Sequence, residues 1–178
     1  MNSPAVTARK IRENFGSVQD VLLFIRMLSL TAVLPAMLRF LSIPRLMKIL
    51  TSRAIKVSRI PGADRVQDKI VKYADYILGR NFWIFKSTCL RRSLILYHFL
   101  RRAGTNVQVC FGVRYKGGLQ QEGRSKELEG HAWLLYKGEL FLERNAAIAR
   151  EYRVTYCYPA EDDHISNEDL EFMGGNRW

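Results

Sequence analysis

The stretch of sequence that decides the fold is Lys86-Ser87-Thr88-Cys89-Leu90-Arg91-Arg92-Ser93-Leu94. Ser87 or Thr88 can cap a helix here, and apolar residues follow at helical spacing as far as Leu100. Cys89 therefore lies in the first helical turn, where free backbone N–H groups and the helix dipole favour a negatively charged thiolate. A reactive cysteine is one interpretation of this position.

The alternative is a cysteine that only fills space in the core, because free cysteines are among the most buried residues. On a helical wheel, Cys89 lies on the packed side of the helix with Ser93, Leu96 and Leu100. The sulfur can thus meet a second element of the fold. Cys89 alone does not separate the two interpretations.

Composition indicates one folded domain. The chain has 178 residues, of which 48% are hydrophobic and 11% aromatic, so that it can bury a sizeable core. Its three cysteines are widely spaced, which predicts neither a disulfide framework nor a zinc site. We therefore expect reduced thiols, a cytoplasmic location, and no metal or other cofactor.

The charge is unevenly distributed. Residues 161–178 carry six acids and one base, so the first 160 residues hold 27 bases and 11 acids, a net charge of +16. Such a surface attracts an acidic partner, which could be nucleic acid, anionic lipid or an acidic peptide. Because the sequence has no nucleic-acid-binding motif, we do not expect nucleic acid.

Residues 18–51 are helical in pattern and very apolar. Arg26 and Arg39 leave only residues 27–38 free of charge, too few for the roughly 20 apolar residues of a transmembrane helix. We expect two short helices, broken near Pro35 or Pro44, that pack on the core. The basic residues among them leave peripheral membrane contact open as the alternative.

The rest of the chain predicts an α+β fold. A helical stripe runs through residues 64–78, period-two alternation predicts a strand over 107–115, and residues 154–158 form another strand-like run. Cys110, within the first of these strands, is expected to be structural. Residues 116–129 form a long polar loop. We divide the chain into an apolar, basic helical segment (1–63), a core (64–160) and an acidic tail (161–178).

A nucleophilic cysteine needs a base, and the chain has only three histidines. His98 lies nine positions after Cys89 on the same helix and so points the opposite way. His164 lies in the acidic tail. His131, which begins an apolar stretch with Trp133, is the remaining candidate.

The third member of a triad depends on the hairpin around Lys137-Gly138. Lys-Gly is a poor pair for a two-residue type I′ turn, so we favour a three-residue loop, which places Glu143 directly across from His131. The two-residue loop would place Arg144 there and turn Glu143 to the other face. A loop of residues 137–139 would instead place Asn145 opposite His131, which makes Asn145 the reserve orienting group.

Three motifs in this order resemble one known family. They are Cys89-Leu90-Arg91-Arg92-Ser93-Leu94, Phe111-Gly112-Val113-Arg114 and His131-Ala132-Trp133, preceded by Pro44-Arg45-Leu46. Together they resemble the B-protein peptidase of lasso-peptide maturation, a transglutaminase-like cysteine peptidase that removes the leader from a ribosomally made precursor. The resemblance covers roughly residues 20–145.

The resemblance implies a transglutaminase-like (papain-like) α+β fold in which a helix with cysteine at its N-terminus packs on an antiparallel sheet. By matching position it implies Cys89 as nucleophile and His131 as base. The acid falls on Glu143, where the family normally has aspartate. The loop at 116–129 is also long for the family.

The family also implies partners. Because residues 1–80 show no strand pattern, the chain resembles the split form of the peptidase, which has no fused leader-recognition domain. The resemblance then implies a precursor peptide as substrate, a separate leader-recognition protein and a cyclase acting downstream. Two other functions stay open: a transglutaminase-like acyltransferase with the same triad, and a non-catalytic, membrane-peripheral adaptor that binds through residues 18–51.

Overall fold

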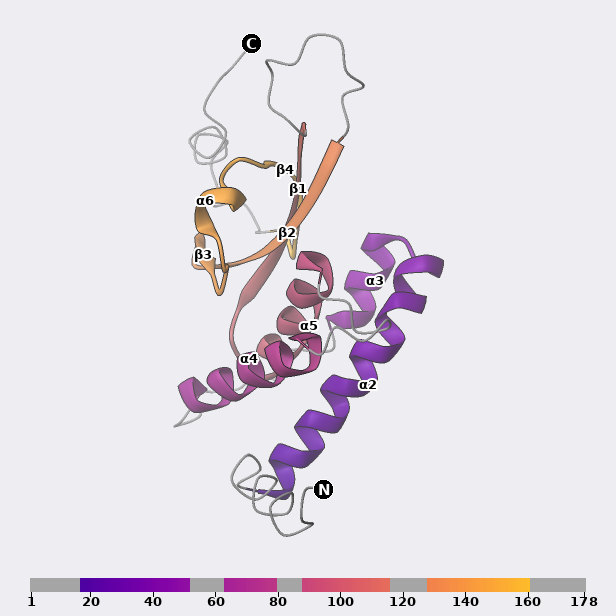
Figure 1. Ribbon diagram of the computed structural model, residues 1–178, viewed down its shortest axis with the longest axis vertical. Helices are drawn as coiled ribbons and strands as arrows, with labels where there is room; N and C mark the ends of the chain where they lie inside the picture. Colours follow the sequence, from indigo (N-terminus) through magenta and orange to yellow (C-terminus); the bar gives the residue numbers. More distant parts are fainter. Residues whose placement is uncertain (1–16, 52–62, 80–87, 116–127, 161–178) are drawn as a thin grey trace, which may run out of the picture.

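The computed structural model describes residues 17–51, 63–79, 88–115 and 128–160. Helices come first along the chain, and a four-stranded sheet follows (Figure 1). The elements are α2 (Val18–Phe40), α3 (Ile43–Leu50), α4 (Ala63–Gly79), α5 (Cys89–Arg102), β1 (Val107–Tyr115), β2 (Leu128–Tyr136), β3 (Glu139–Phe141), α6 (Ala146–Ala149) and β4 (Arg153–Tyr158).

Of the two expected break points, Pro35 and Pro44, the structure has the one near Pro44. Helix α2 runs through Pro35 without interruption, and the chain turns only at residues 41–42, before α3. Pro35 removes one backbone hydrogen bond, but buried residues on both sides of it, Met27 and Leu34 among them, hold the helix against the core. Pro44 lies in the first turn of α3, where a missing N–H is tolerated.

Helix α5 is the central helix of the fold. Its middle is almost wholly buried, and it contacts α2, α3, α4 and both central strands of the sheet. One hydrophobic core joins residues from all four long helices with Val107, Val109 and Leu134 of the sheet. The predicted domain boundary at residue 63 stays a prediction, although the helices on both sides of it share this core.

The sheet is antiparallel throughout, with strand order β3-β2-β1-β4. Because side chains alternate along a strand, one face of β1 and β2 packs on the helices. The opposite face carries a smaller cluster made of Cys110, Trp133, Leu135 and Tyr152. His131 precedes Trp133 by two residues on β2, so it belongs to this second face.

The hairpin register differs from the one that we favoured. Tyr136 pairs with Glu139, so the loop is the two-residue Lys137-Gly138. Both loop residues have positive φ, 54° for Lys137 and 80° for Gly138, as a type I′ turn requires. A type I′ turn matches the right-handed twist of the flanking strands. This match outweighs the energetic cost of placing lysine in a left-handed conformation.

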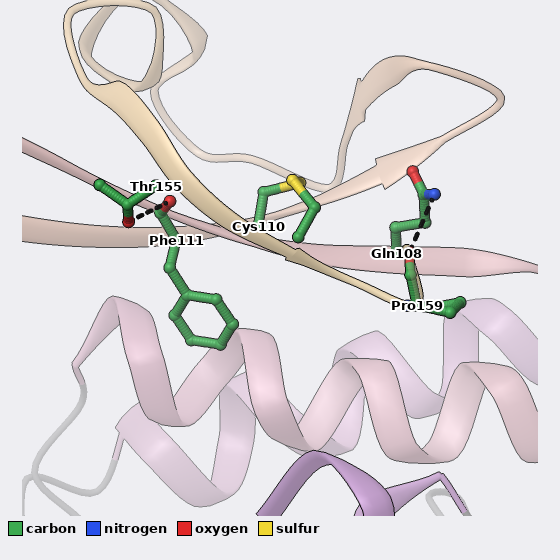
Figure 2. The surroundings of a disulfide bond; sticks show 6 residues. Gln108, Cys110, Phe111, Thr155 and Pro159 are labelled. Carbon is green, nitrogen blue, oxygen red and sulfur yellow. Dashed lines mark hydrogen bonds between the residues drawn. A yellow bond between two sulfur atoms is a disulfide. The ribbon is translucent and has the colours of Figure 1, made fainter. Parts of the chain in front are cut away.

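The cysteines also differ from the expectation of reduced thiols. Cys110 and Cys157 are paired neighbours on β1 and β4, and their sulfur atoms form a disulfide (Figure 2). Antiparallel pairing brings together two residues that are 47 positions apart, which the spacing in the sequence could not show. Cys110 is thus structural, as expected, and Cys89 is the free cysteine.

The fold class is confirmed as α+β, with helices followed by an antiparallel sheet. Helix α5 starts at Cys89 and is capped by the Thr88 hydroxyl, which accepts a hydrogen bond from the Arg91 N–H at 3.3 Å. The loop at 116–129, apart from its last two residues, lies outside the described residues, as do His164 and the acidic tail.

Disulfide formation can be checked by counting thiols. Titration of the denatured protein with a thiol reagent should find one reactive thiol before reduction and three after it. Because the disulfide closes a long loop of chain, reduction should lower the free energy of unfolding by about 2–4 kcal/mol. Three thiols without reduction would contradict the pairing, and Cys89→Ser is the control that should leave the change on reduction intact.

Candidate active site

Cys89 is the first residue of α5 and is half-buried. Thr88 caps the helix one position earlier, while Leu90 packs against the core on the other side. The helix N-terminus therefore presents its backbone N–H groups beside the Cys89 sulfur. One turn further along, the Ser93 hydroxyl donates a hydrogen bond of 2.9 Å to the Ala132 carbonyl and so fastens α5 to β2 next to His131.

The imidazole of His131 is held among aromatic rings. Its centroid lies 5.8 Å from that of the Trp133 ring, which is stacked on it at 23°, and 5.0 Å from that of the Tyr152 ring, which is tilted by 31°. Such contacts restrict the rotation of the imidazole. His131 is thus fixed in orientation by packing before any hydrogen bond is counted.

Glu143 reaches His131. The Oε2 atom of Glu143 lies 3.5 Å from Nε2 of His131, and the two side chains are only 13% and 15% exposed. Among the described residues, this nitrogen has no hydrogen-bond partner, so the contact with Glu143 falls short of a hydrogen bond. Contacts of this kind are often long in a ligand-free site and shorten when substrate binds.

The contact arises in a way that the register argument did not predict. With Tyr136 paired to Glu139, a continued strand would bring Arg144 opposite His131. Strand β3 instead ends at Phe141, and Leu142 adopts a left-handed conformation with φ of 57°. This conformation costs a non-glycine residue about 1–2 kcal/mol. It turns the chain so that Glu143 reaches the histidine.

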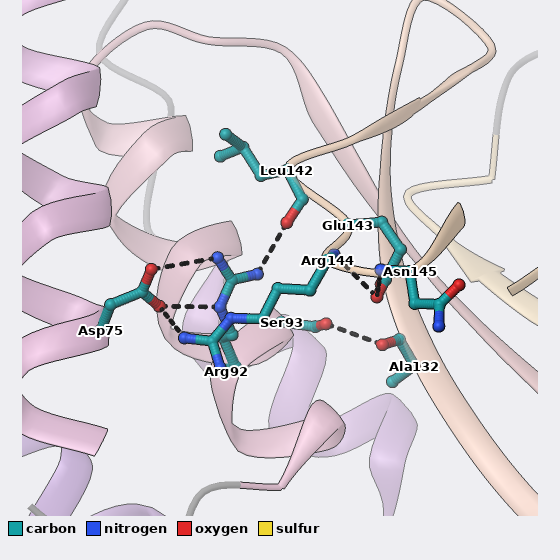
Figure 3. Close-up of polar contacts among 8 residues, drawn as sticks. All are labelled: Asp75, Arg92, Ser93, Ala132, Leu142, Glu143, Arg144 and Asn145. Carbon is teal, nitrogen blue, oxygen red and sulfur yellow. Dashed lines mark hydrogen bonds and ion pairs between the residues drawn. The ribbon is translucent and has the colours of Figure 1, made fainter. Parts of the chain in front are cut away.

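Arg92 holds this turn in place (Figure 3). Its guanidinium donates to the Leu142 carbonyl at 2.8 Å and to Oδ1 of Asp75 on α4 at 2.9 Å. Arg144, which leaves the sheet at the same turn, also donates to Asp75 at 2.9 Å. Helix α4, helix α5 and the turn after β3, three segments far apart in the sequence, are thereby joined next to Glu143.

The carboxyl of Asp75 responds to these neighbours. Partial burial by itself raises the pKa of Asp75, but hydrogen bonds and charges from Arg92 and Arg144 outweigh that effect. The pKa of this carboxyl consequently lies below its usual value. Asp75 is thus a stable anion that orients both guanidinium groups.

Asn145, the reserve orienting group, has a different task. Its side-chain oxygen accepts a hydrogen bond from the Ile148 N–H at 3.3 Å and caps the short helix α6. The backbone N–H groups of Arg144 and Asn145 both point to Oε1 of Glu143, at 3.0 and 3.3 Å. Two backbone donors therefore fix one oxygen of Glu143 and leave the other toward His131.

Gly112 stands directly opposite His131 in the pairing of β1 with β2. A side chain here would meet the Trp133 ring at 2.7 Å and the Arg153 carbonyl at 2.8 Å. The pairing of β1 with β4 shifts at the same point, and the Thr155 hydroxyl donates to the Phe111 carbonyl across the shift (Figure 2). Gly112 thus lets Trp133 and the β4 backbone close over the strand beside the histidine.

Tyr152 and Arg114 belong to the same neighbourhood, and sequence reasoning gave neither a role. The Arg114 guanidinium lies 4.6 Å from the centroid of the Tyr152 ring. Burial raises the pKa of Tyr152; the Arg114 charge opposes this, while Glu129 and, more weakly, Cys89 add to it. Tyr152 is also in contact with His131. No sequence pattern pointed to Tyr152.

His98 faces away from the site, as predicted. Its Nδ1 atom donates to the Leu50 carbonyl at 2.7 Å, at the end of α3. Burial lowers the pKa of His98, and this hydrogen bond only partly opposes the shift. Among the described residues, no group of three or more His, Cys, Asp or Glu side chains could hold a metal ion.

Comparison with known proteins gives one match. The family model described as the transglutaminase-like superfamily matches residues 30–157, which is well over half of the chain. No curated protein and no solved structure matches the chain.

Gly112→Ala should be destabilising, because the new methyl group would overlap the Trp133 ring and the β4 backbone. Overpacking of this kind costs about 1–3 kcal/mol in the free energy of unfolding. Urea denaturation can measure the loss. Gly79→Ala is the control, since nothing lies within 4 Å of a methyl group at that position; equal losses in both variants would contradict the close approach at Gly112.

Asp75→Asn should lower stability at neutral pH and much less in acid. A carboxyl whose folded pKa is depressed contributes stability above its unfolded pKa, near 3.8, and loses it as the pH falls through the lower folded value. The difference between wild type and variant in urea denaturation should therefore shrink below about pH 4. Asp68→Asn, at an exposed position of the same helix, is the matched control for the effect at pH 7. A difference that does not change with pH would show that Asp75 acts only by its shape.

Proposed function

Because this chain belongs to the transglutaminase-like superfamily, we propose that it is a cysteine peptidase of lasso-peptide maturation, with Cys89 as nucleophile. It would remove the leader from a ribosomally made precursor peptide. His131 is the general base and acid, and Glu143 orients it. The superfamily includes cysteine peptidases and acyltransferases alike. The more specific role of leader peptidase is the part that we propose.

The observation that carries this proposal is the contact between His131 and Glu143. A largely shielded carboxylate 3.5 Å from one imidazole nitrogen can orient the ring. Because Nε2 faces Glu143, Nδ1 is the nitrogen left for proton exchange with a thiol. The disulfide occupies the other two cysteines, so Cys89 is the thiol available for chemistry.

The proposed reaction has two stages. The Cys89 thiolate attacks the carbonyl carbon of the scissile peptide bond, and the imidazolium of His131 donates its proton to the leaving amine. Water, deprotonated by His131, then attacks the thioester and releases the acid product and the thiol. Backbone N–H groups at the start of α5, at Cys89 or Leu90, would stabilise the oxyanion in both stages.

The proposed partners follow from the family resemblance. They are the precursor peptide, a separate leader-recognition protein and a cyclase that acts on the released core peptide. The net charge of +16 over the first 160 residues suits an acidic leader or an acidic partner.

A cleavage assay tests the proposal. The full chain is mixed with the precursor peptide encoded beside its gene and with the leader-recognition protein, and products are weighed by mass spectrometry. Cys89→Ala should abolish cleavage, while His131→Ala and Glu143→Gln should lower kcat/KM by on the order of a hundredfold or more. Glu139→Gln, at an exposed acid of the same hairpin, is the matched control for Glu143→Gln and should cleave normally.

Product masses separate the alternatives. Hydrolysis adds one water to the cleaved peptide, whereas an acyltransferase would join the acyl fragment to an added amine. Unchanged cleavage by Cys89→Ala would refute the proposed nucleophile. If no product forms, and if Cys89 of the wild type reacts with iodoacetamide no faster than a model thiol and no faster than Cys89 of the His131→Ala variant, the non-catalytic adaptor is favoured.

A further inference from the structure

Helix α2 has an exposed face that is mostly apolar. Its large exposed side chains lie on one side of the helical wheel, so they form one broad stripe along the helix. The stripe, together with Ile49 of α3, is here called the apolar face; its members are Val18, Val21, Leu22, Ile25, Leu28, Val33, Phe40 and Ile49, each between 37% and 80% exposed. An exposed patch of this extent marks an interaction site.

Basic residues border the apolar face. Arg26, Arg39, Arg45 and Lys48 are all exposed. The single acid of residues 18–51 is Asp20, which is buried and paired with Lys69 at 2.8 Å. The exposed part of α2 and α3 therefore combines apolar side chains with positive charge alone.

A core helix of a soluble protein does not explain this face. Helix α2 is long and apolar enough to cross a membrane, the one such helix in the described part of the chain. Only 17% of its apolar 18-residue window is buried inside the protein, whereas a core helix would be mostly buried.

A membrane-spanning helix does not explain it either, because the opposite side of α2 is packed against the rest of the fold. Met27, Thr31 and Leu34 are fully buried there, and the Phe24 ring lies 5.6 Å from that of Tyr73 on α4. Surrounding α2 with lipid would break these contacts and place Asp20 in hydrocarbon. In Figure 1, α2 and α3 form one side of the molecule, with α5 between them and the sheet.

We propose that the protein docks on anionic phospholipid bilayers through the apolar face of α2 and α3. Helix α2 would lie in the plane of the interface, about 35 Å long, with its stripe among the acyl chains. The four basic residues would contact phosphate head groups. This surface attaches the protein without unfolding it, and the proposal is independent of the reaction assigned to Cys89.

Sedimentation with lipid vesicles tests the proposal on the full chain. The protein should sediment with vesicles of phosphatidylglycerol and phosphatidylcholine, sediment much less with phosphatidylcholine alone, and be released by salt. Leu22→Ser/Ile25→Ser should weaken binding on the order of a hundredfold, because both side chains would be buried in lipid. Val66→Ser/Leu128→Ser, which removes two exposed apolar side chains elsewhere, is the matched control and should bind as the wild type does.

The charges are tested separately. Arg45→Gln/Lys48→Gln should weaken binding to anionic vesicles about tenfold or more and leave the weak binding to phosphatidylcholine unchanged. Arg150→Gln/Arg153→Gln removes the same charge from the far part of the chain and should have a much smaller effect.

Three results would overturn the proposal. One is absence of sedimentation with anionic vesicles, and another is equal loss of binding in the apolar variant and its control. The third is a dimer, seen by light scattering without lipid, that Leu22→Ser/Ile25→Ser converts to monomer, since a second copy would then cover the face. Unchanged circular dichroism spectra and thermal midpoints are required of each variant.

Discussion

The site depends on the hydrogen bonds that the guanidinium of Arg92 makes. This group lies in the first turns of α5, is largely shielded from solvent, and joins Asp75 on α4 to the Leu142 carbonyl after β3. Charge-assisted hydrogen bonds of this kind are stronger than neutral ones and are directional. Because this guanidinium is largely shielded from solvent, loss of the Asp75 carboxylate would leave its charge without compensation. The helix that carries Cys89 and the turn that carries Glu143 therefore cannot shift independently.

Two further contacts complete this frame. Ser93, next to Arg92, fastens α5 to the backbone of β2 beside His131. The left-handed Leu142 then redirects the chain, and backbone N–H groups hold one oxygen of Glu143. A residue with a strained backbone persists only where surrounding contacts hold it in that conformation. Here the hydrogen bond from Arg92 to the Leu142 carbonyl does so. The strained turn at the end of the short strand β3 thus places the Glu143 carboxyl near His131.

The protein has two surfaces of different character. The sheet face with His131, Tyr152 and Trp133 gathers aromatic and titratable groups in a partly buried setting. The outer side of α2 and α3 gathers apolar and basic groups in an exposed one. Helix α5 lies between them and contacts both parts of the fold. A substrate bound at the sheet and a bilayer held at the helices would not compete for the same residues.

Sequence alone predicted most of the elements and named Cys89 and His131 as site candidates. The pattern predicted the helix from Cys89, the strand from Val107 and the choice of His131, because capping and periodicity are local properties. It did not determine the hairpin register, since both faces of β2 are apolar, and Glu143 was named through a register that the structure contradicts. Strand pairing alone brought Cys110 to Cys157, and packing alone carried α2 through Pro35. Tertiary contacts decided these points because each depends on residues far apart in the chain, which no local pattern records.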